Sequence, residues 1–212
     1  MSRKVLKILT SYISLSSLSD GFSCINKKRI VFGALNFIAK YQKNSMKTKK
    51  NIVLIGMPAV GKSTIGNLLA QNIGFDFLDS DDLIQSKEQK PLSQIIIEKG
   101  LDQFLQIEES HIVSIRCLNH VIATGGSVVY SKKAMEHLSK ISTIIYLSIP
   151  LDILLKRLSD MTSRGVAVRP GQKIEDLYQE RTPLYDTYCD IKIDCLSMTA
   201  EQVVEQAMAS LF

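Results

Sequence analysis

The sequence predicts an α/β fold of three layers, in which a five-stranded, mostly parallel sheet carries helices on both faces. Two observations lead to this fold class. Short runs rich in β-branched residues, such as residues 51–55 and 143–149, have the composition of buried strands. Segments with the apolar spacing of helices separate these runs, and such alternation is typical of a parallel sheet.

Charge is divided unevenly along the 212 residues. The net charge is +5, yet residues 1–50 carry 11 of the 26 Lys and Arg and only one of the 21 acids, Asp20. The rest of the chain is therefore net acidic, with 15 basic and 20 acidic side chains. We predict a basic tail over residues 1–46 and one domain over residues 47–212, which is long enough to bury a full core.

Two interpretations of the basic tail stay open. The tail is rich in Ser and nearly free of acids, which is typical of a disordered segment or an organelle transit peptide. Alternatively, Met46 is the true start of the protein. Neither interpretation assigns any chemistry to the tail.

Composition excludes several classes of function for the domain. Its acidic balance disfavours nucleic acid, because a basic surface binds a polyanion only where the charge is concentrated. The longest apolar runs, such as Ile141–Ile149, fall short of the about 20 residues that span a membrane. The four cysteines form no Cys-x-x-Cys pair, so neither a disulfide framework nor a zinc site is indicated. We expect a monomeric, cytoplasmic protein that acts on a small molecule, with organelle targeting as the alternative in a eukaryote.

A predicted strand, loop and helix follow one another from Asn51. The strand over residues 51–55 leads into Gly56-Met-Pro-Ala-Val-Gly61-Lys62-Ser63, which has the form G-x-x-x-x-G-K-[ST]. The glycines let backbone N–H groups point inward, where they and the positive end of the helix bind phosphate oxygens. Lys62 then reaches the β- and γ-phosphates, and the Ser63 hydroxyl is placed to bind Mg²⁺. The predicted ATP-binding residues of this loop are Gly56, Met57, Pro58, Ala59, Val60, Gly61, Lys62, Ser63 and Thr64.

A second predicted strand, over residues 74–78, ends in Asp79-Ser80-Asp81-Asp82. Alternate residues at the end of a strand face the same way, so Asp79 and Asp81 are expected to point together toward the phosphate loop. One carboxylate would hold Mg²⁺ and the other would accept a proton from an attacking hydroxyl. The alternative is that Asp82, and one of the other two, caps a helix that begins near Leu83.

With these motifs the sequence resembles the shikimate kinase family, and the resemblance covers about 160 residues. It rests on the phosphate loop and on four further segments: Leu78-Asp79-Ser80-Asp81, Phe104 to Glu108, Ala123-Thr-Gly-Gly-Ser127 and Leu177 to Tyr185. The resemblance implies the fold of a P-loop kinase, with ATP as phosphoryl donor and Mg²⁺ as cofactor. It also implies that Asp79 belongs to the magnesium site and that Asp81 contacts the acceptor hydroxyl.

The third predicted strand, over residues 121–124, leads into a glycine turn. Gly125 and Gly126 would let the backbone approach a small polar substrate closely, and the resemblance assigns them to the acceptor site. Ser127 stands where the family has a third glycine. Its side chain either adds a hydrogen bond or narrows the pocket.

After a fourth strand and a helix over residues 150–158, a loop bounded by glycine and proline follows at residues 164–171. The resemblance makes this loop the lid over the nucleotide, with Arg164 and Arg169 near ATP and Arg169 neutralising charge on the transferred group. The family continues from Arg-Pro with two leucines, whereas this chain continues with Gly171 and Gln172. The alternative for Arg169 is a surface side chain.

Segment 177–185 is similar to the late helix of the family, where Arg181 would bind the carboxylate of the substrate through charge-assisted bonds. The alternative is that Arg181 pairs with Glu180 or Asp186. A last strand is predicted over residues 191–194. Thr199 and Gln202 then form a capping box that opens the final helix.

Leu105 is the main departure from the family, which has a carboxylate-binding Arg between Phe104 and Glu108. A leucine cannot pair with an anion, and the loss of a charge-assisted bond costs about 1.5–3 kcal/mol. This substitution weighs against shikimate as the acceptor, although Glu108 keeps its place in the site.

The sequence therefore predicts an ATP-dependent kinase that phosphorylates a hydroxyl of a small molecule, with shikimate, giving shikimate 3-phosphate, as the expected acceptor. Lys62, Asp81 and Arg169 are its expected catalytic residues, and Ser63 and Asp79 are its metal ligands. One alternative is a relative that acts on another small hydroxy compound. Two further alternatives are a nucleotide-binding module without kinase activity and a nucleic-acid-modifying kinase, which the acidic domain disfavours.

Overall fold

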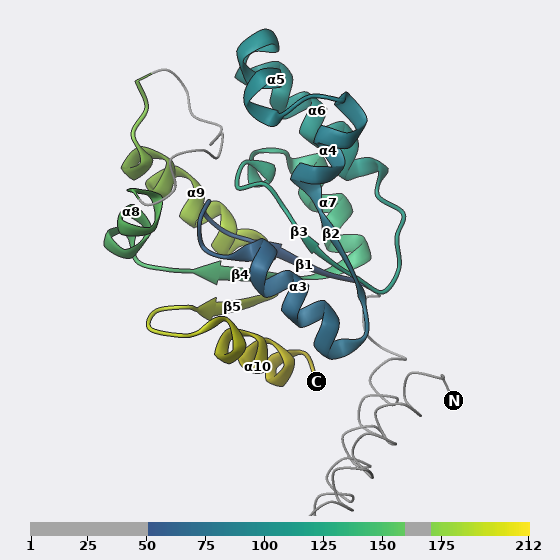
Figure 1. The fold of residues 1–212 in the computed structure, drawn as a ribbon, viewed down its shortest axis with the longest axis vertical. Helices are drawn as coiled ribbons and strands as arrows, with labels where there is room; N and C mark the ends of the chain where they lie inside the picture. Colours follow the sequence, from purple (N-terminus) through teal and green to yellow (C-terminus); the bar gives the residue numbers. More distant parts are fainter. Residues whose placement is uncertain (1–50, 160–170) are drawn as a thin grey trace, which may run out of the picture. The chain divides into compact units, whose positions relative to one another are not determined.

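A computed structural model describes residues 51–159 and 171–212, which form a parallel β-sheet with helices on both faces (Figure 1). The sheet has five strands in the order β2-β3-β1-β4-β5, and each of its four pairings is parallel. The strands are β1 (Asn51–Ile55), β2 (Asp76–Asp79), β3 (His120–Ala123), β4 (Ser142–Ser148) and β5 (Ile191–Asp194). The predicted fold class is confirmed, with a described sheet that is parallel throughout.

Helices cover the two faces of the sheet. α3 and α10 pack against each other on one face, whereas α7 and α9 pack against β4 on the other (Figure 1). α4, α5 and α6 follow β2 and contact one another beyond the edge of the sheet. The helices are α3 (Lys62–Ile73), α4 (Ser80–Glu88), α5 (Leu92–Lys99), α6 (Leu101–Ser114), the short 3-10 helix η1 (Val128–Tyr130), α7 (Lys132–Ile141), α8 (Leu151–Ser159), α9 (Ile174–Tyr188) and α10 (Ala200–Leu211).

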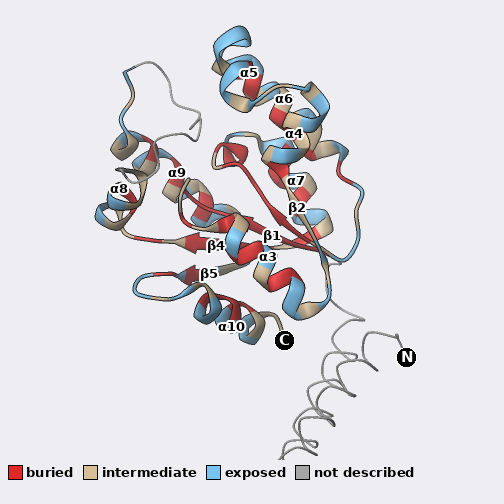
Figure 2. Cartoon of the chain, in the orientation of Figure 1, coloured by how far each residue is buried: buried red, intermediate tan, exposed pale blue. Residues whose placement is uncertain are grey.

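Two groups of buried apolar side chains hold these elements together. The larger core lies on both sides of the sheet, and β1 is buried along its whole length (Figure 2). A smaller cluster of Ile84, Ile95 and Phe104 joins α4, α5 and α6. The second cluster gives these three helices a core of their own, beside the site described below.

Element boundaries follow the sequence closely, with shifts of one to three residues at several elements. The predicted strand at 74–78 is shifted to Asp76–Asp79, because Gly74 ends α3 in the left-handed conformation with φ of 73° and the chain must then turn. The third and fourth strands each begin one residue earlier than predicted. The helix expected near Leu83 begins at Ser80 instead.

Several other local predictions are confirmed. β1 and β5 have the predicted bounds. The capping box is present, since the Thr199 N–H donates to Gln202 Oε1 over 2.8 Å and the Gln202 N–H donates to Thr199 Oγ1 over 3.3 Å. Within residues 51–159 and 171–212, no helix has the length and apolar content needed to cross a membrane. The predicted boundary between residues 46 and 47 lies outside the described residues.

Candidate active site

The phosphate loop joins the end of β1 to the start of α3. Gly56 has φ of 144°, and a Cβ there would lie 2.5 Å from the carbonyl oxygen of Leu147, so only glycine fits. Gly61, at the N-terminus of α3, has φ of 105°. The buried Lys62 side chain folds back over the loop, where its Nζ donates to the carbonyl oxygens of Gly56 and Met57, both over 2.8 Å. The loop thus brings an ammonium group to the positive end of a helix, which is a site for phosphate.

Arg157 supports this loop from α8, a contact that the sequence did not indicate. Its Nη1 donates to the carbonyl oxygen of Val60 over 3.2 Å. The loop also contains a strained residue, since Ala59 has φ of 62° and L side chains rarely adopt this conformation. The long arginine stabilises a loop whose backbone is costly to hold.

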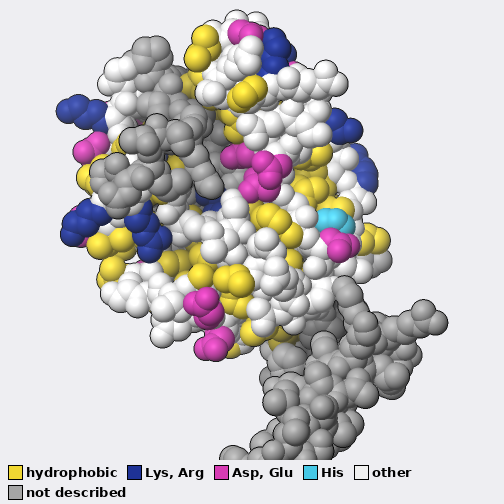
Figure 3. All heavy atoms as spheres, viewed as in Figure 1, with side chains coloured by type: hydrophobic (Ala, Val, Ile, Leu, Met, Phe, Trp, Pro, Cys, Tyr) yellow, Lys and Arg dark blue, Asp and Glu magenta, His cyan; other side chains and the backbone are white. Residues whose placement is uncertain are grey.

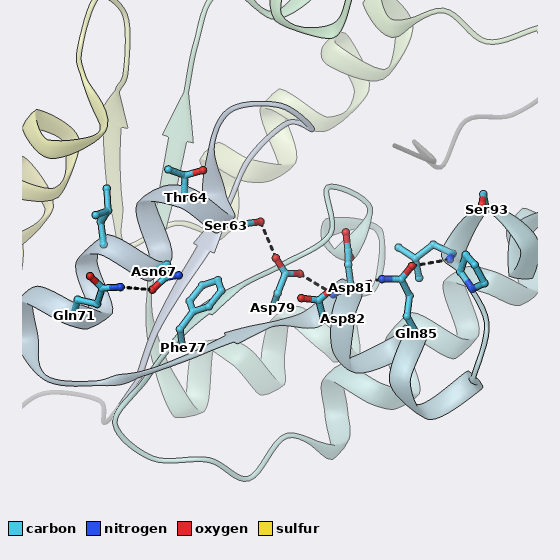
Figure 4. Close-up of a pocket in the computed structure, with 13 residues that line it drawn as sticks. Ser63, Thr64, Asn67, Gln71, Phe77, Asp79, Asp81, Asp82, Gln85 and Ser93 are labelled. Carbon is cyan, nitrogen blue, oxygen red and sulfur yellow. Dashed lines mark hydrogen bonds between the residues drawn. The ribbon is translucent and has the colours of Figure 1, made fainter. Parts of the chain in front are cut away.

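Asp79 links the end of β2 to the phosphate loop. Ser63 Oγ donates to Asp79 Oδ2 over 2.7 Å, and Asp79 Oδ1 accepts from the N–H of Asp81 over 3.0 Å (Figure 4). Asp79 is therefore the N-cap of α4, and Asp81 and Asp82 lie in its first turn. The alternative that the aspartates cap this helix is therefore confirmed for Asp79 and wrong for Asp82, because α4 begins three residues earlier than expected.

Asp79 and Asp81 lie together as predicted, but not because they alternate along a strand. Asp79 ends the strand and Asp81 already belongs to α4, so a helical turn brings the two carboxylates to one pocket. That pocket has a volume of about 710 Å³ and lies between α3 and α4 (Figure 4). Acidic side chains gather near the start of α4 in the space-filling view, and Asp79, Asp81 and Asp82 line the pocket (Figure 3).

The glycine turn after β3 is fastened from two sides. The Gly125 N–H donates to the buried Ser80 hydroxyl over 3.0 Å, and the Tyr185 hydroxyl donates to the Gly126 carbonyl oxygen over 2.7 Å. A Cβ at Gly125 would lie 2.5 Å from Glu108 Oε1 and 3.0 Å from Asp81 Oδ1. Glycine is therefore required where the backbone approaches two carboxyl groups.

Glu108 is a buried acid in this part of the site, with 2% of its surface exposed. Its pKa is raised to about 7, mainly by burial and also by the nearby Asp81, and this net value already includes the lowering effects of Ser127 and of the charge of Arg181. Glu108 Oε1 has no hydrogen-bond partner among the described residues. Ser127, which stands in place of the third glycine, lines the same cavity as Glu108.

Arg181 lies on α9 and is 1% exposed. Its Nε donates to the Tyr130 hydroxyl over 3.1 Å, and a Cβ at Gly126 would lie 3.1 Å from its Nη1. The two carboxylates considered as structural partners both have other contacts: Glu180 accepts from Tyr130 and Asp186 accepts from Lys192. The guanidinium is thus placed beside the glycine turn.

One cavity of about 300 Å³ brings the two halves of the site together. Its walls include the phosphate loop, the acids after β2, the glycine turn, Glu108 and Arg181. The predicted site residues that line it are Pro58, Ala59, Gly61, Lys62, Ser63, Thr64, Asp79, Asp81, Gly125, Gly126 and Arg181. A phosphate site and an acceptor pocket that share one cavity suit direct transfer between two bound molecules.

Three sequence-predicted positions need separate comment. Arg164 and Arg169 lie outside the described residues. Leu105 lies on α6, packs against the Ile84, Ile95 and Phe104 cluster, and is not among the described residues that line the cavity. The leucine has therefore joined the apolar core of α4, α5 and α6.

Comparisons with known proteins place the chain in a family. A family model described as shikimate kinase matches residues 58–212. The chain is 38% identical over 160 residues to the shikimate kinase of Thermodesulfovibrio yellowstonii, a match that covers 74% of this chain and 92% of the relative. The chain belongs to the shikimate kinase family.

Solved structures of this family agree with the fold. The shikimate kinase from Acinetobacter baumannii in complex with shikimate matches with a TM-score of 0.70 and 28% identity, and the match covers 79% of this chain and 96% of that one. The shikimate kinase from Aquifex aeolicus matches with a TM-score of 0.65 and 31% identity, and the match covers 76% and 95%. The protein is accordingly a phosphotransferase of the P-loop class that uses ATP.

Proposed function

We propose that the protein transfers the γ-phosphoryl group of ATP to a hydroxyl of shikimate, giving shikimate 3-phosphate. The observation that carries this proposal is a single cavity. Lys62 of the phosphate loop, Asp81 and the buried Arg181 all line it. Shikimate combines a carboxylate with neighbouring hydroxyls. An arginine at one side and an aspartate near the phosphate loop match that combination.

ATP would place its phosphates against the loop over residues 56–64. The backbone N–H groups at the start of α3 and the Lys62 ammonium bind the β- and γ-phosphates. Lys62 Nζ now bonds to two loop carbonyls, so it is already held near the phosphate position. Arg164 and Arg169, which lie outside the described residues, remain predicted contacts of the transferred group.

Ser63 and Asp79 would hold the magnesium ion. Their side-chain oxygens lie 2.7 Å apart at the N-terminus of α3, in the wall of the same cavity. Mg²⁺ prefers oxygen ligands and keeps several waters and substrate phosphates, so a hydroxyl and one carboxylate suit it. When bound, the ion neutralises negative charge on the phosphates.

Asp81 would orient the acceptor hydroxyl and accept its proton. The first turn of α4 holds this carboxylate near Gly125, where a Cβ would lie 3.0 Å from Asp81 Oδ1. The substrate must therefore sit between the glycine turn and the phosphate loop. This position favours in-line attack of the hydroxyl on the γ-phosphorus.

Arg181 would bind the carboxylate of shikimate. The Leu105 position supplies no second cation, so we expect weaker binding of shikimate than a two-arginine site would give, by a factor of about ten to a hundred. This loss lowers the affinity for shikimate only. The residues proposed to act on the transferred phosphoryl group are not affected by the leucine at position 105.

Coupled measurement of ADP release from the full chain with ATP and Mg²⁺ tests the proposal. We expect release that depends on shikimate, and we expect Asp81→Asn to lower kcat strongly. A panel of other hydroxy acids, sugars and hydroxy amino acids provides the comparison. Turnover of another acceptor without turnover of shikimate would overturn the substrate and leave the reaction class intact.

We also propose that the protein acts in the cytoplasm as a monomer, without nucleic acid or membrane partners. The acidic balance of residues 51–212 supports the absence of nucleic acid, since a net negative domain has little attraction to polyanions. The large apolar side chains that are exposed among the described residues lie in different segments: Ile97 on α5, Tyr130 on η1, and Leu118 and Leu196 in two separate loops.

A further inference from the structure

Tyr130 lies at the end of η1, four residues after Gly126, and its hydroxyl has two partners. It accepts a hydrogen bond from Arg181 Nε over 3.1 Å and donates one to Glu180 Oε2 over 3.0 Å. The guanidinium carbon of Arg181 also lies 5.0 Å from the centre of the Tyr130 ring. One tyrosine thus contacts the buried arginine through both its ring and its hydroxyl.

Glu180 is itself held by a third residue. Gln172, just before α9, donates from Nε2 to Glu180 Oε1 over 3.0 Å. The chain of hydrogen bonds therefore runs from Gln172 through Glu180 and Tyr130 to Arg181. Both oxygens of Glu180 are engaged, so the carboxylate has a defined orientation that fixes the Tyr130 hydroxyl in turn.

A tyrosine hydroxyl is a suitable partner for an arginine that must bind an anion. A buried guanidinium needs acceptors for its five N–H groups, and a carboxylate in contact with it would neutralise its charge. The Tyr130 hydroxyl accepts from Nε without carrying a formal charge. The terminal nitrogen Nη1 of the same guanidinium lies beside Gly126, in the wall of the acceptor pocket.

We propose that Tyr130 is a positioning residue, which holds Arg181 in the orientation that binds the acceptor carboxylate and is itself held by Glu180 and Gln172. The inference rests on the proposed function, because it takes Arg181 as the group that binds the carboxylate. The positioning of Arg181 is especially important in this chain because Leu105 replaces the other carboxylate-binding arginine of the family. Because position 105 has no arginine, the affinity for the carboxylate depends more strongly on the orientation of Arg181.

Tyr130→Phe is the variant that tests this role, because it keeps the ring and removes the hydroxyl. Tyr188→Phe is the matched control, at the end of α9 and away from the described cavity lining. In the full chain, Tyr130→Phe should raise both the calorimetric Kd and the KM for shikimate about tenfold, while kcat and the KM for ATP change less than about twofold. Circular dichroism and thermal unfolding check that each variant folds.

An analogue of shikimate with a hydroxymethyl group in place of the carboxylate separates positioning from a general structural role. Tyr130→Phe should bind this analogue as wild type does. Glu180→Gln should raise the Kd for shikimate less than Tyr130→Phe, and the double variant should resemble Tyr130→Phe, since the two residues act in series.

Three results would overturn the inference. Equal losses of affinity for shikimate and the analogue would make Tyr130 a structural residue only. A Kd for shikimate as in Tyr188→Phe would remove the positioning role while the proposed function stands. If wild type neither binds nor phosphorylates shikimate, the proposed function fails and the role of Tyr130 fails with it.

Discussion

Replacing Glu108 by Gln removes a buried titratable group and keeps the shape of the side chain. The carboxyl group is 2% exposed, and burial raises its pKa from 4.5 to about 7. A raised pKa means that the folded protein holds this proton more tightly than the unfolded chain does. The shift corresponds to about 3 kcal/mol in the free energy of unfolding.

The sign of the effect follows from which state binds the proton. Below pH 4.5 Glu108 is protonated in both states and contributes no pH dependence. Between pH 4.5 and about 7 the unfolded chain has lost the proton and the folded protein keeps it, so stability falls as the pH rises. Above pH 7 Glu108 is ionised in both states, so the loss in the free energy of unfolding is complete and no longer changes with pH.

Urea denaturation of wild type and Glu108→Gln from pH 5 to pH 8 measures this effect. The chain has no Trp, so far-UV circular dichroism is the suitable signal. The stability of wild type relative to the variant should fall by roughly 2–3 kcal/mol over this range, because other titrating groups cancel in the difference.

Glu109→Gln is the matched control on the same helix. Hydrogen bonding with Ser131, followed by the contacts with Lys133, lowers the pKa of Glu109, so its contribution is present above the unfolded pKa and is lost as the pH falls. The free energy of unfolding of wild type relative to Glu109→Gln should therefore not decline between pH 5 and 7. A constant difference between wild type and Glu108→Gln across the range would refute the reasoning.

Four further variants test other parts of the site. Lys62→Met should lower kcat at least about a hundredfold with the fold unchanged by circular dichroism, because it removes the cation of the phosphate site. Asp79→Ala should raise the Mg²⁺ concentration for half-maximal rate about tenfold and cost about 1 kcal/mol as a lost helix cap. Gly56→Ala should lower the free energy of unfolding by about 2 kcal/mol, because its Cβ would lie 2.5 Å from the Leu147 carbonyl oxygen at φ of 144°. Leu105→Arg should lower the KM for shikimate about tenfold by restoring a second cation.

Each of these outcomes has a clear opposite. Normal turnover by Lys62→Met would mean that the lysine does not reach the phosphates. An unchanged Mg²⁺ dependence in Asp79→Ala would remove that residue from the metal site. Wild-type stability of Gly56→Ala would show that the loop adjusts freely, and an unchanged KM in Leu105→Arg would show that this position does not face the carboxylate.

Features encoded within a short stretch of sequence could be predicted well. The strand, loop and helix over residues 51–73 are contiguous, and their glycines and apolar spacing depend on local conformation only. The same is true of the capping box at Thr199. Asp79 and Asp81 were placed together correctly but for the wrong reason, since the start of α4 at Ser80 depends on the Asp79 cap.

Contacts between distant segments left no pattern that the sequence could reveal. Ser80 and Gly125 are 45 residues apart, Tyr130 and Arg181 are 51 apart, and Val60 and Arg157 are 97 apart. None of these contacts follows from periodicity or composition, because each depends on how the strands are ordered in the sheet. The motifs of the site could therefore be predicted from the sequence, whereas the long-range hydrogen bonds that hold them in place could be seen only in the structure.

Phosphorus NMR of the full chain with ATP, Mg²⁺ and shikimate tests the central claim most directly. We predict that the γ-phosphate signal of ATP declines while a phosphate monoester signal coupled to a shikimate ring proton grows in equal amount, and that Asp81→Asn abolishes this growth. Appearance of inorganic phosphate alone, or of a monoester only with a different acceptor, would contradict the account.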